Sequence, residues 1–316
     1  MAHIVVRRHN VHGMPADRYA EALRARLPDH EISVAQTPRA EEELVADATV
    51  LTGTGVSESL LARADSLRLF ARTYAGYDHL PLDALADRDV VLTTASGVHG
   101  PNIAAHVLGA WLSFARGFGR ARRQQRAGVW QAFQASDFAG SRVCVVGMGA
   151  IGEAIVDRLD GFDVETVVVR HSPEKGGADE VYGYDEIHEA VADARYVALA
   201  CPLTEVTRGL VDAAVLRTMH PESVLVNVAR GPVVDTEALV AALNRNKIGG
   251  AALDVTDPEP LPGDHPLWGF ENVLLTPHNA GHTPEYYDRL ADIVAENVRQ
   301  AEERGEWDGL ENQVRL

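Results

Sequence analysis

The stretch RVCVVGMGAIG (142–152) decides the fold of the second half of the chain. An apolar run rich in β-branched residues leads into three glycines that open a helix. The first glycine permits a tight turn, the second lets the backbone approach a pyrophosphate, and the third allows close helix–strand packing. The helix N-terminus would then hold the phosphates. Such glycines also occur in ordinary turns, but the strand before and the helix after favour a dinucleotide site formed by Gly147, Met148, Gly149, Ala150, Ile151 and Gly152.

The end of the next expected strand indicates which dinucleotide binds. NAD enzymes normally place Asp or Glu there to bond the adenosine ribose hydroxyls. This chain has Arg170, His171 and Ser172 instead, with Lys175 in the following loop. A guanidinium pairs with a 2′-phosphate in two-point fashion. We therefore predict NADP as the preferred cofactor, with NAD use possible; the alternative is a solvated Arg170 and loose NAD binding.

Working outward, short apolar runs alternate with helical patterns, which predicts an α/β fold with doubly wound parallel sheets. The expected strands are 3–7, 32–35, 49–52, 68–73, 90–94, 142–146, 164–170, 196–200, 223–228, 248–254 and 272–275. Helices are expected over 16–27, 101–125 and 284–304, among others. We predict a Rossmann-type dinucleotide domain (99–282) inserted into a flavodoxin-like substrate domain (1–98 and 283–316), with crossings near 96–101 and 280–284.

The chain is strongly acidic, with 46 acidic against 29 basic residues and a formal charge of -17. This balance argues against nucleic acid or an anionic membrane as a partner. Lys175 and Lys247 are the only lysines. Excess acid with almost no lysine is typical of proteins from salt-loaded cytoplasm, where salt screens self-repulsion. A GC-rich genome is the alternative explanation.

Several function classes are disfavoured by what the sequence carries. No apolar run approaches the roughly 20 residues that span a bilayer, and the first ten residues do not resemble a secretory signal. Cys144 and Cys201 offer no disulfide or zinc spacing, so a cytoplasmic location is expected. His278 and His282 stand four apart, but Pro284 follows and no helical H-E-x-x-H surrounds them. We expect no metal site.

Three polar residues follow buried strands in the second half, where doubly wound sheets place their ligands. Arg230 follows the run 224–228, Glu259 lies past the strand ending near 254, and His278 follows the strand at 272–275. Each alone could be a surface or structural residue. Their occurrence together, downstream of a dinucleotide loop, favours a catalytic group.

The chain resembles the D-isomer-specific 2-hydroxyacid dehydrogenases, a family that includes glyoxylate/hydroxypyruvate reductases, phosphoglycerate dehydrogenase and formate dehydrogenase. The resemblance extends from about residue 70 to residue 281. It rests on TYAGYDHL (73–80), GMGAIG (147–152), CPLTEVTRGLVD (201–212), VNVARGPVVDTEAL (226–239), AALDVTDPEPLP (251–262) and HPLWGFENVLLTPHNAG (265–281).

The resemblance implies a role for each member of the catalytic group. Arg230 would pair with the substrate carboxylate and polarise the 2-oxo group. His278, as imidazolium, would donate a proton to the forming alkoxide and act as base in the reverse direction. Glu259 would bond the other imidazole nitrogen, orienting the ring and favouring its charged form.

Further contacts are also implied by the resemblance. The backbone N–H groups of Ala75 and Gly76 match a carboxylate-binding loop, and Tyr74 would shape the pocket. The helix that begins at Pro101 resembles the segment through which relatives pair as homodimers. Additional cofactor contacts are expected at Pro202, Thr204, Ala229 and Asp254.

The sequence thus predicts an oxidoreductase that transfers hydride between NADP(H), or NAD(H), and a small 2-oxo acid or D-2-hydroxy acid. One alternative is an NAD-linked phosphoglycerate dehydrogenase, disfavoured because no regulatory extension or additional phosphate-binding cluster is evident. Another is a dinucleotide-sensing regulator, since relatives act as corepressors on the same scaffold. The uniform acidity and the lack of interaction tails disfavour that reading.

Overall fold

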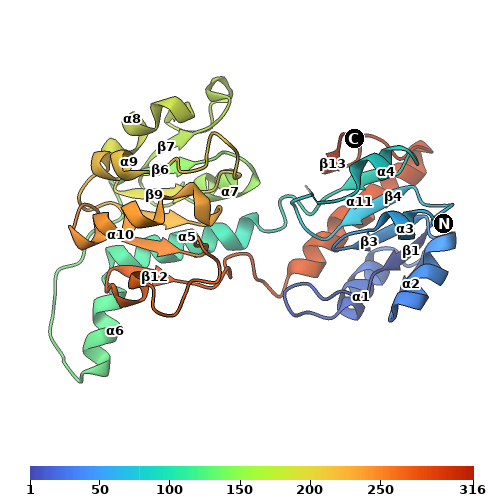
Figure 1. Cartoon of the computed structure of the whole chain (residues 1–316), viewed down its shortest axis with the longest axis horizontal. Coiled ribbons are helices and arrows are strands. Elements are labelled where there is room, and N and C mark those ends of the chain that lie inside the picture. The colour runs from blue at the N-terminus through green and yellow to red at the C-terminus, as the bar shows by residue number, and fades with distance from the viewer. Residues whose placement is uncertain (78) are drawn as a thin grey trace. The chain divides into compact units, whose positions relative to one another are not determined.

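A computed structural model describes residues 1–77 and 79–316, so Asp78 of the motif 73–80 lies outside the described residues. The chain divides into two compact units. Unit 1 comprises Met1–Val98 and His282–Leu316, and unit 2 comprises His99–Gly281 (Figure 1). Unit 2 is therefore one continuous stretch that interrupts unit 1. Each unit holds its own sheet.

Unit 1 is a flavodoxin-like layer of helices and one sheet, in the strand order β13-β5-β4-β3-β1-β2. All neighbours pair in parallel except β13, which is antiparallel to β5. Its strands are β1 (His3–Val6), β2 (Glu31–Val34), β3 (Val50–Gly53), β4 (Leu69–Arg72), β5 (Val91–Thr93) and β13 (Gln313–Val314). Its helices are α1 (Ala16–Arg26), α2 (Pro38–Leu44), α3 (Glu58–Leu61), α4 (Leu82–Ala86) and α11 (Tyr286–Arg304), with a 3-10 turn η1 (Val45–Asp47).

Successive residues of the unit 1 strands point to opposite faces of the sheet. Ile4 packs with Leu23 of α1 and Leu290 of α11, which lie on one face. Val5 packs instead with Leu61 and Leu85 of α3 and α4 on the other face. This burial on both faces explains the continuous apolar runs in the sequence.

Unit 2 holds a fully parallel sheet in the order β12-β11-β10-β9-β6-β7-β8, which is the Rossmann arrangement with one added edge strand. Its strands are β6 (Arg142–Val146), β7 (Glu165–Val169), β8 (Glu180–Tyr182), β9 (Tyr196–Leu199), β10 (Val224–Asn227), β11 (Gly250–Leu253) and β12 (Val273–Leu275). Its α-helices are α5 (Gly100–Ala115), α6 (Phe118–Arg126), α7 (Ala150–Asp157), α8 (Ile187–Ala192), α9 (Ala213–Thr218) and α10 (Thr236–Asn244). Four 3-10 turns complete it: η2 (Pro173–Lys175), η3 (Tyr184–Glu186), η4 (Gly231–Val233) and η5 (Pro266–Gly269).

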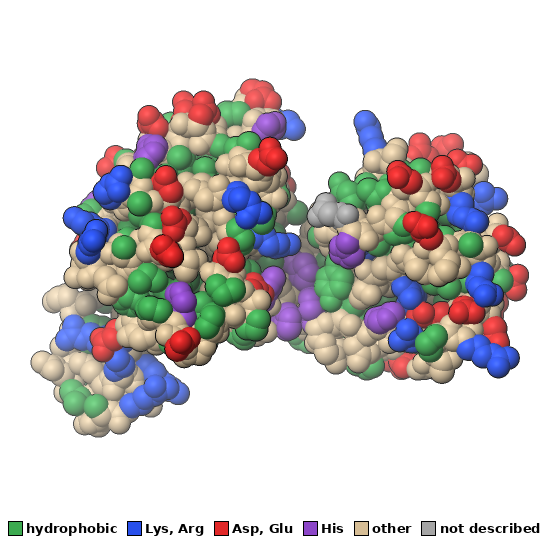
Figure 2. Space-filling model, in the orientation of Figure 1, with side chains coloured by type: hydrophobic (Ala, Val, Ile, Leu, Met, Phe, Trp, Pro, Cys, Tyr) green, Lys and Arg blue, Asp and Glu red, His purple; other side chains and the backbone are tan. Residues whose placement is uncertain are grey.

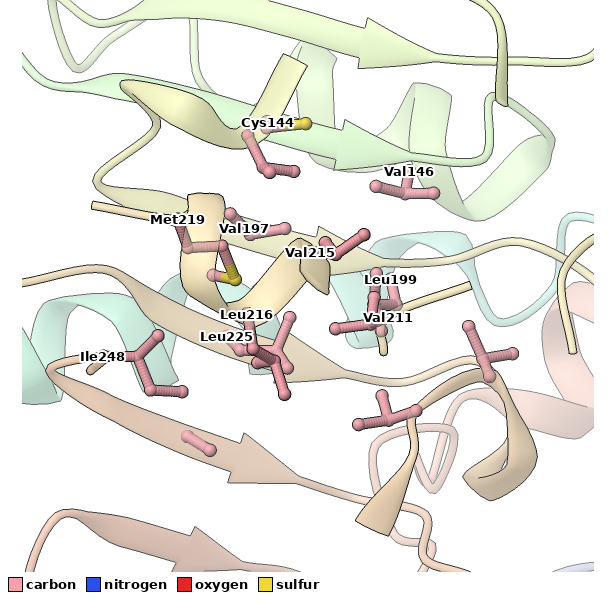
Figure 3. Packing of buried hydrophobic residues seen from close by; sticks show 14 of the residues in the cluster. Cys144, Val146, Val197, Leu199, Val211, Val215, Leu216, Met219, Leu225 and Ile248 are labelled. Atoms are coloured by element: carbon pink, nitrogen blue, oxygen red, sulfur yellow. The ribbon is translucent and has the colours of Figure 1, made fainter. Parts of the chain in front are cut away.

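The core of unit 2 lies between the sheet and these helices. Val146, Val197 and Leu225, from neighbouring strands, pack against Val215 and Leu216 of α9 (Figure 3). The strand orders of the two units confirm the predicted fold class, two doubly wound sheets with the Rossmann-type unit inserted into the flavodoxin-like one.

The helix predicted over 101–125 is wrong as one continuous element. It is divided into α5 and α6 at Gly117, whose φ of 64° lies in the left-handed region. A side chain there would meet the ring of Phe133 at 2.7 Å. Helix α5 is largely buried, whereas no residue of α6 is buried, so α6 stands away from the sheet (Figure 1).

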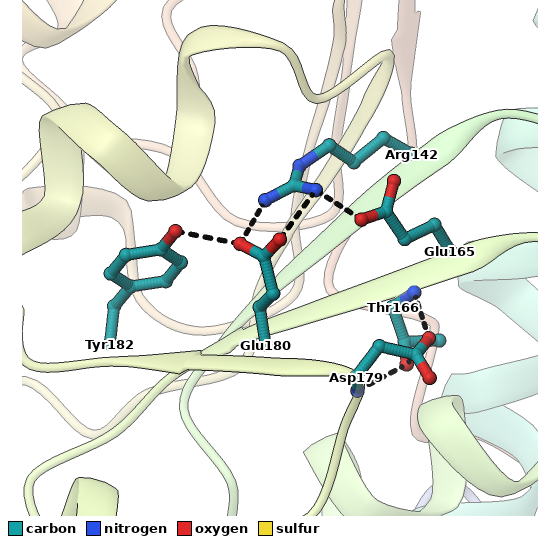
Figure 4. A network of polar contacts seen from close by, with 6 residues as sticks. All are labelled: Arg142, Glu165, Thr166, Asp179, Glu180 and Tyr182. Carbon is teal, nitrogen blue, oxygen red and sulfur yellow. Dashed lines mark hydrogen bonds and ion pairs between the residues drawn. The ribbon is translucent and has the colours of Figure 1, made fainter.

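Strand β8 was not predicted, because its three residues are polar or half-buried. It is fixed at the sheet edge by side chains: Arg142 forms ion pairs with Glu180 and Glu165, and the Tyr182 hydroxyl donates to Glu180 at 2.6 Å (Figure 4). The Arg142 guanidinium, followed by the Tyr182 hydroxyl, lowers the pKa of Glu180. At this edge, contacts between polar side chains therefore fix the register of the strand. Elsewhere in the sheet, the burial of apolar side chains fixes it.

Within the described part of the chain, no helix has the length and apolar character required to cross a membrane. Acidic side chains are scattered over both units on the face drawn in Figure 2.

Candidate active site

The glycine loop joins β6 to α7 as expected, and its three glycines differ in what surrounds them. Gly147 has a φ of 100°, and an added Cβ would lie 2.5 Å from the backbone nitrogen of Cys201. A Cβ on Gly152 would lie 2.0 Å from the carbonyl oxygen of Gly147. Gly149 is exposed, and a Cβ there would meet nothing within 4 Å. The fold itself thus requires the first and third glycines, whereas the second faces open space.

This contrast gives a matched pair of variants. Gly152→Ala should lower the free energy of unfolding by about 3 kcal/mol or more, because backbone must move to admit the methyl group. Gly149→Ala should change it by less than about 0.5 kcal/mol yet weaken dinucleotide binding. Urea titration and fluorescence titration with NADPH measure the two effects. Unchanged affinity in Gly149→Ala would contradict a ligand in the open space.

Arg170 follows β7 and lies beside this loop. Its Nη1 donates to the carbonyl oxygen of Gly176 at 2.7 Å, and its backbone N–H donates to Tyr182 at 3.0 Å. His171 is exposed and Ser172 half-buried. The turn after β7 therefore brings the three predicted donors to the same strand end, with the guanidinium anchored through one of its nitrogens.

Two more predicted cofactor contacts lie in the loop after β9. Pro202 and Thr204 are exposed. The Thr207 hydroxyl donates to the carbonyl oxygen of Pro202 at 2.5 Å and accepts from the backbone N–H of Thr204 at 2.8 Å. The buried Thr207 thus holds this loop in shape. No signal for this role is visible in the sequence beyond the position of Thr207 in the motif 201–212.

Arg230 and Ala229 follow β10. Ala229 is buried, and its backbone N–H donates to the Asn227 side chain at 3.0 Å. The same Asn227 side chain donates to the carbonyl oxygen of Arg230 at 3.1 Å. Arg230 is exposed, and its Nη1 donates to the Ala229 carbonyl at 2.7 Å. A buried amide therefore fixes the backbone from which the exposed guanidinium projects.

Glu259 and His278 form a direct pair. The Nδ1–H of His278 donates to Glu259 Oε1 at 2.7 Å, and both side chains are about half exposed. His278 has a φ of 53°, a left-handed conformation uncommon outside glycine. Its backbone N–H donates to the carbonyl oxygens of Asp254 at 2.8 Å and Thr276 at 3.0 Å. With Nδ1 engaged by the carboxylate, Nε2 is the ring nitrogen left for a ligand.

Asp254 holds the loop that carries His278. Its buried carboxylate accepts from the Thr276 hydroxyl at 2.6 Å and from the backbone N–H groups of Asn279 at 2.8 Å and Ala280 at 3.0 Å. We expected Asp254 only as a cofactor contact. One signal in the sequence points to this second role: Asp254 is a lone carboxylate at the end of an otherwise apolar strand. A buried charge of this kind needs hydrogen-bond donors around it.

A cavity of about 450 Å³ adjoins the Glu259–His278 pair. Leu261, Trp268 and Leu275 form an apolar wall, and Asp254 also lines it. The ends of β10, β11 and β12 are neighbours in the sheet. Arg230, Asp254 and His278 therefore project from adjacent strand ends at the carboxyl edge, which is where open α/β sheets bind ligands.

The predicted substrate loop lies in unit 1, after β4. Tyr74 is half-buried, and burial raises the pKa of its hydroxyl. Ala75 and Gly76 are exposed. The Tyr286 hydroxyl of α11 donates to the backbone carbonyl of Thr73, which fixes the start of the loop.

The cysteines take no part in the site. Burial raises the pKa of Cys144 to about 12 and that of Cys201 to about 11, so both thiols stay protonated at neutral pH. Among residues 1–77 and 79–316, no group of three or more His, Cys, Asp or Glu side chains is arranged to hold a metal ion.

Similarity to known proteins extends over most of the chain. The sequence model of the D-isomer specific 2-hydroxyacid dehydrogenase NAD binding domain matches residues 108–280. The (S)-sulfolactate dehydrogenase of Chromohalobacter salexigens is 36% identical over 254 residues, 78% of this chain and 82% of that protein. The glyoxylate reductase of Thermofilum pendens is 33% identical over 253 residues, 77% and 74% of the two chains. A crystal structure of a D-isomer specific 2-hydroxyacid dehydrogenase from Xanthobacter autotrophicus Py2, in complex with NADPH and MES, is 30% identical with a TM-score of 0.80, covering 99% of this chain and 98% of that one.

Proposed function

From the premise that this chain belongs to the D-isomer specific 2-hydroxyacid dehydrogenase family, we propose that it reduces a small 2-oxo acid to the D-2-hydroxy acid with NADPH. The chain is an oxidoreductase that uses a nicotinamide dinucleotide. The hydrogen bond of 2.7 Å between Glu259 and His278 carries the proposal. It leaves Nε2 of an oriented imidazole as a proton donor at the carboxyl edge of a Rossmann sheet.

Each side chain of the site has a chemical task in this reaction. When bound, the reduced nicotinamide supplies hydride to the carbonyl carbon. Arg230 binds the substrate carboxylate and stabilises charge on the 2-oxo group through its fork of N–H donors. His278 donates the Nε2 proton to the forming alkoxide and takes it back in the reverse direction. Glu259 orients the ring and stabilises its charge.

We propose that the remaining predicted contacts bind the substrate and the cofactor. The backbone N–H groups of the loop after β4 would bind the substrate carboxylate, and the open space at Gly149 suits a pyrophosphate. The residues concerned are Tyr74, Ala75 and Gly76 for substrate, and Gly147, Met148, Gly149, Ala150, Ile151, Gly152, Pro202, Thr204, Ala229 and Asp254 for cofactor.

The loss of absorbance at the reduced nicotinamide band tests the proposal. NADPH and NADH are compared with glyoxylate, hydroxypyruvate, pyruvate and longer 2-oxo acids. Turnover with at least one of them is expected. Tight dinucleotide binding with no turnover of any 2-oxo acid would leave the sensing role as the better account.

The preference for NADP rests on Arg170, His171 and Ser172 at the end of β7. Arg170→Asp should weaken NADPH binding at least about 100-fold, because it replaces a phosphate-pairing fork with a like charge. The carboxylate introduced by this substitution should weaken NADH binding far less, since it can accept hydrogen bonds from the ribose hydroxyls. Fluorescence titration with both cofactors measures this. An equal loss for the two would show that Arg170 does not face the 2′-phosphate.

We also propose that the chain forms a homodimer through α5, α6 and the segment that follows. Helix α6 has no buried residue, and Phe118, Val129 and Trp130 are exposed. Phe118 lies on α6, and Val129 and Trp130 lie in the segment that follows it; exposed apolar side chains in neighbouring segments are typical of an interaction surface. Sedimentation equilibrium measures the mass of the protein in solution and so shows whether it is a monomer or a dimer.

We propose finally that the protein works in cytoplasm, and in one of high salt content. The charge of -17 with two lysines supports this. Molar KCl should then raise the midpoint temperature of unfolding, because salt screens repulsion between the acidic groups.

A further inference from the structure

The cavity beside Glu259 and His278 is larger than the reacting atoms of a 2-oxo acid require. Its volume of about 450 Å³ lies within the range of roughly 300–1,000 Å³ that is typical of ligand pockets. A two- or three-carbon 2-oxo acid would leave most of this space to water, which apolar walls disfavour. The residues that line the cavity all belong to the stretch 253–278, so the cavity lies within unit 2.

Apolar side chains line this cavity from several segments of unit 2. Leu253 is buried at the end of β11, and Leu275 ends β12, the edge strand of the sheet (Figure 1). Pro260 and Leu261 come from the loop between these strands, and Trp268 comes from η5. The cavity therefore has apolar walls from both strand ends and from the connection that joins them.

Trp268 is held in place although much of its side chain is exposed. The indole Nε1–H donates to the carbonyl oxygen of Pro262 at 2.8 Å, and the preceding Leu267 is buried in the core of unit 2. Trp268 is 56% exposed, so the fold gains little from its ring. Ligand pockets are lined mainly by apolar and aromatic side chains. An anchored ring that remains open on such a cavity therefore suits contact with an apolar ligand.

Beyond the His278 ring, the described residues that line the cavity offer a second polar group no side-chain donor that is not already engaged. The Thr256 hydroxyl donates to the carbonyl oxygen of Pro258 at 2.8 Å, and the indole N–H is engaged as described above. The Thr276 hydroxyl donates to Asp254 at 2.6 Å. Asp254 itself is one of two carboxylates in the lining. A second anion on the substrate would be repelled and left without donors, which makes its burial costly.

We propose that this cavity binds an apolar side chain of the substrate, so that the preferred substrates are 2-oxo acids with a hydrocarbon chain, such as 4-methyl-2-oxopentanoate. This inference rests on the proposed function. The 2-oxo group lies at His278, and the hydrocarbon chain packs against Leu261, Trp268 and Leu275. Acids with a second anionic group are poor substrates for the same reason.

A series of 2-oxo acids of increasing chain length tests the proposal. The value of kcat/KM should rise about four- to tenfold for each methylene group from pyruvate through 2-oxobutanoate to 2-oxopentanoate, because more apolar area is removed from water. Oxaloacetate, which carries a carboxylate in place of the terminal methyl group of 2-oxobutanoate, should be reduced at least about tenfold less efficiently. A flat or falling series would overturn the proposal.

Variants of Trp268 test the contact itself. Trp268→Ala should lower the ratio of kcat/KM for 4-methyl-2-oxopentanoate to that for pyruvate about 10- to 100-fold, mainly through KM for the longer acid. Trp268→Phe keeps an apolar ring and should retain most of the preference. The matched control is Leu274→Ala, because Leu274 is an exposed apolar residue of β12 that does not line the cavity. An unchanged ratio in Trp268→Ala would contradict the proposed contact.

A measurement without turnover distinguishes failure of this inference from failure of the proposed function. With oxidised dinucleotide present no hydride is available, and the indole N–H signal of Trp268 can be followed by NMR after assignment through Trp268→Phe. It should shift with 4-methyl-2-oxopentanoate and much less with pyruvate. Such a shift in a protein that reduces no 2-oxo acid would support the apolar site and remove the reaction. Turnover of pyruvate with neither a shift nor a preference for longer chains would keep the reaction and overturn the inference.

Discussion

Replacement of His278 by Gln should lower kcat for 2-oxo acid reduction about 10³-fold, within the range contributed by a positioned general acid. The amide can hydrogen-bond to Glu259 but cannot release a proton to the alkoxide. The backbone conformation at φ 53° is held by the hydrogen bonds of Asp254 and Thr276, so the loop should remain in place. Steady-state rates and single-turnover traces with NADPH measure the loss.

A companion variant separates proton donation from ring orientation. Glu259→Gln retains an acceptor oxygen for Nδ1–H, and its effect on kcat should be smaller than that of His278→Gln. The two changes should not add in the double variant, because both act through one imidazole. NADPH affinity serves as the control. A His278→Gln enzyme with kcat within threefold of the parent would show that another group donates the proton.

Replacement of Arg230 by Lys should lower kcat/KM for 2-oxo acids about 10²- to 10³-fold, although the charge is retained. The ammonium is a point charge and cannot present the planar fork that matches a carboxylate. Loss of one such donor group at a developing oxyanion has a cost of this size. The effect should appear in both KM and kcat, since Arg230 is proposed to touch both the carboxylate and the 2-oxo group.

The matched control for this change is Arg245→Lys, an exposed arginine that follows α10 in the same unit. It should leave kcat/KM within about twofold. Dinucleotide affinity should be equal in both variants. If Arg230→Lys behaves like Arg245→Lys, the guanidinium does not contact the substrate, and its bond to the Ala229 carbonyl is its main role.

The features that can be predicted from the sequence are those determined by residues close together in the chain. Strand β6 and the glycine loop follow from a β-branched run and from turns that only glycine permits, so both were placed correctly. Glu259 and His278 lie 19 residues apart, and their pairing was expected only from the family resemblance. The structure shows the bond itself.

Other features depend on partners distant in the chain. Gly117, where α5 and α6 divide, packs against the ring of Phe133, and Arg142 forms ion pairs with Glu180 of β8 and Glu165 of β7. The Asp254 carboxylate holds the loop of His278 largely by accepting hydrogen bonds from backbone N–H groups. Because every residue except proline has such a group, these contacts cannot be recognised from the sequence. Local propensity cannot encode such contacts.

The insertion of unit 2 into unit 1 has a consequence for synthesis on the ribosome. Unit 2 is one continuous stretch and can fold as it emerges, whereas unit 1 needs α11 and β13, which are synthesised after unit 2. Until then the sheet face that holds Ile4 lacks the cover of Leu290 and its neighbours on α11. At about 5–20 residues per second, the nascent chain carries this face, covered by α1 alone, for many seconds, so a chaperone has its greatest opportunity to act before α11 leaves the exit tunnel.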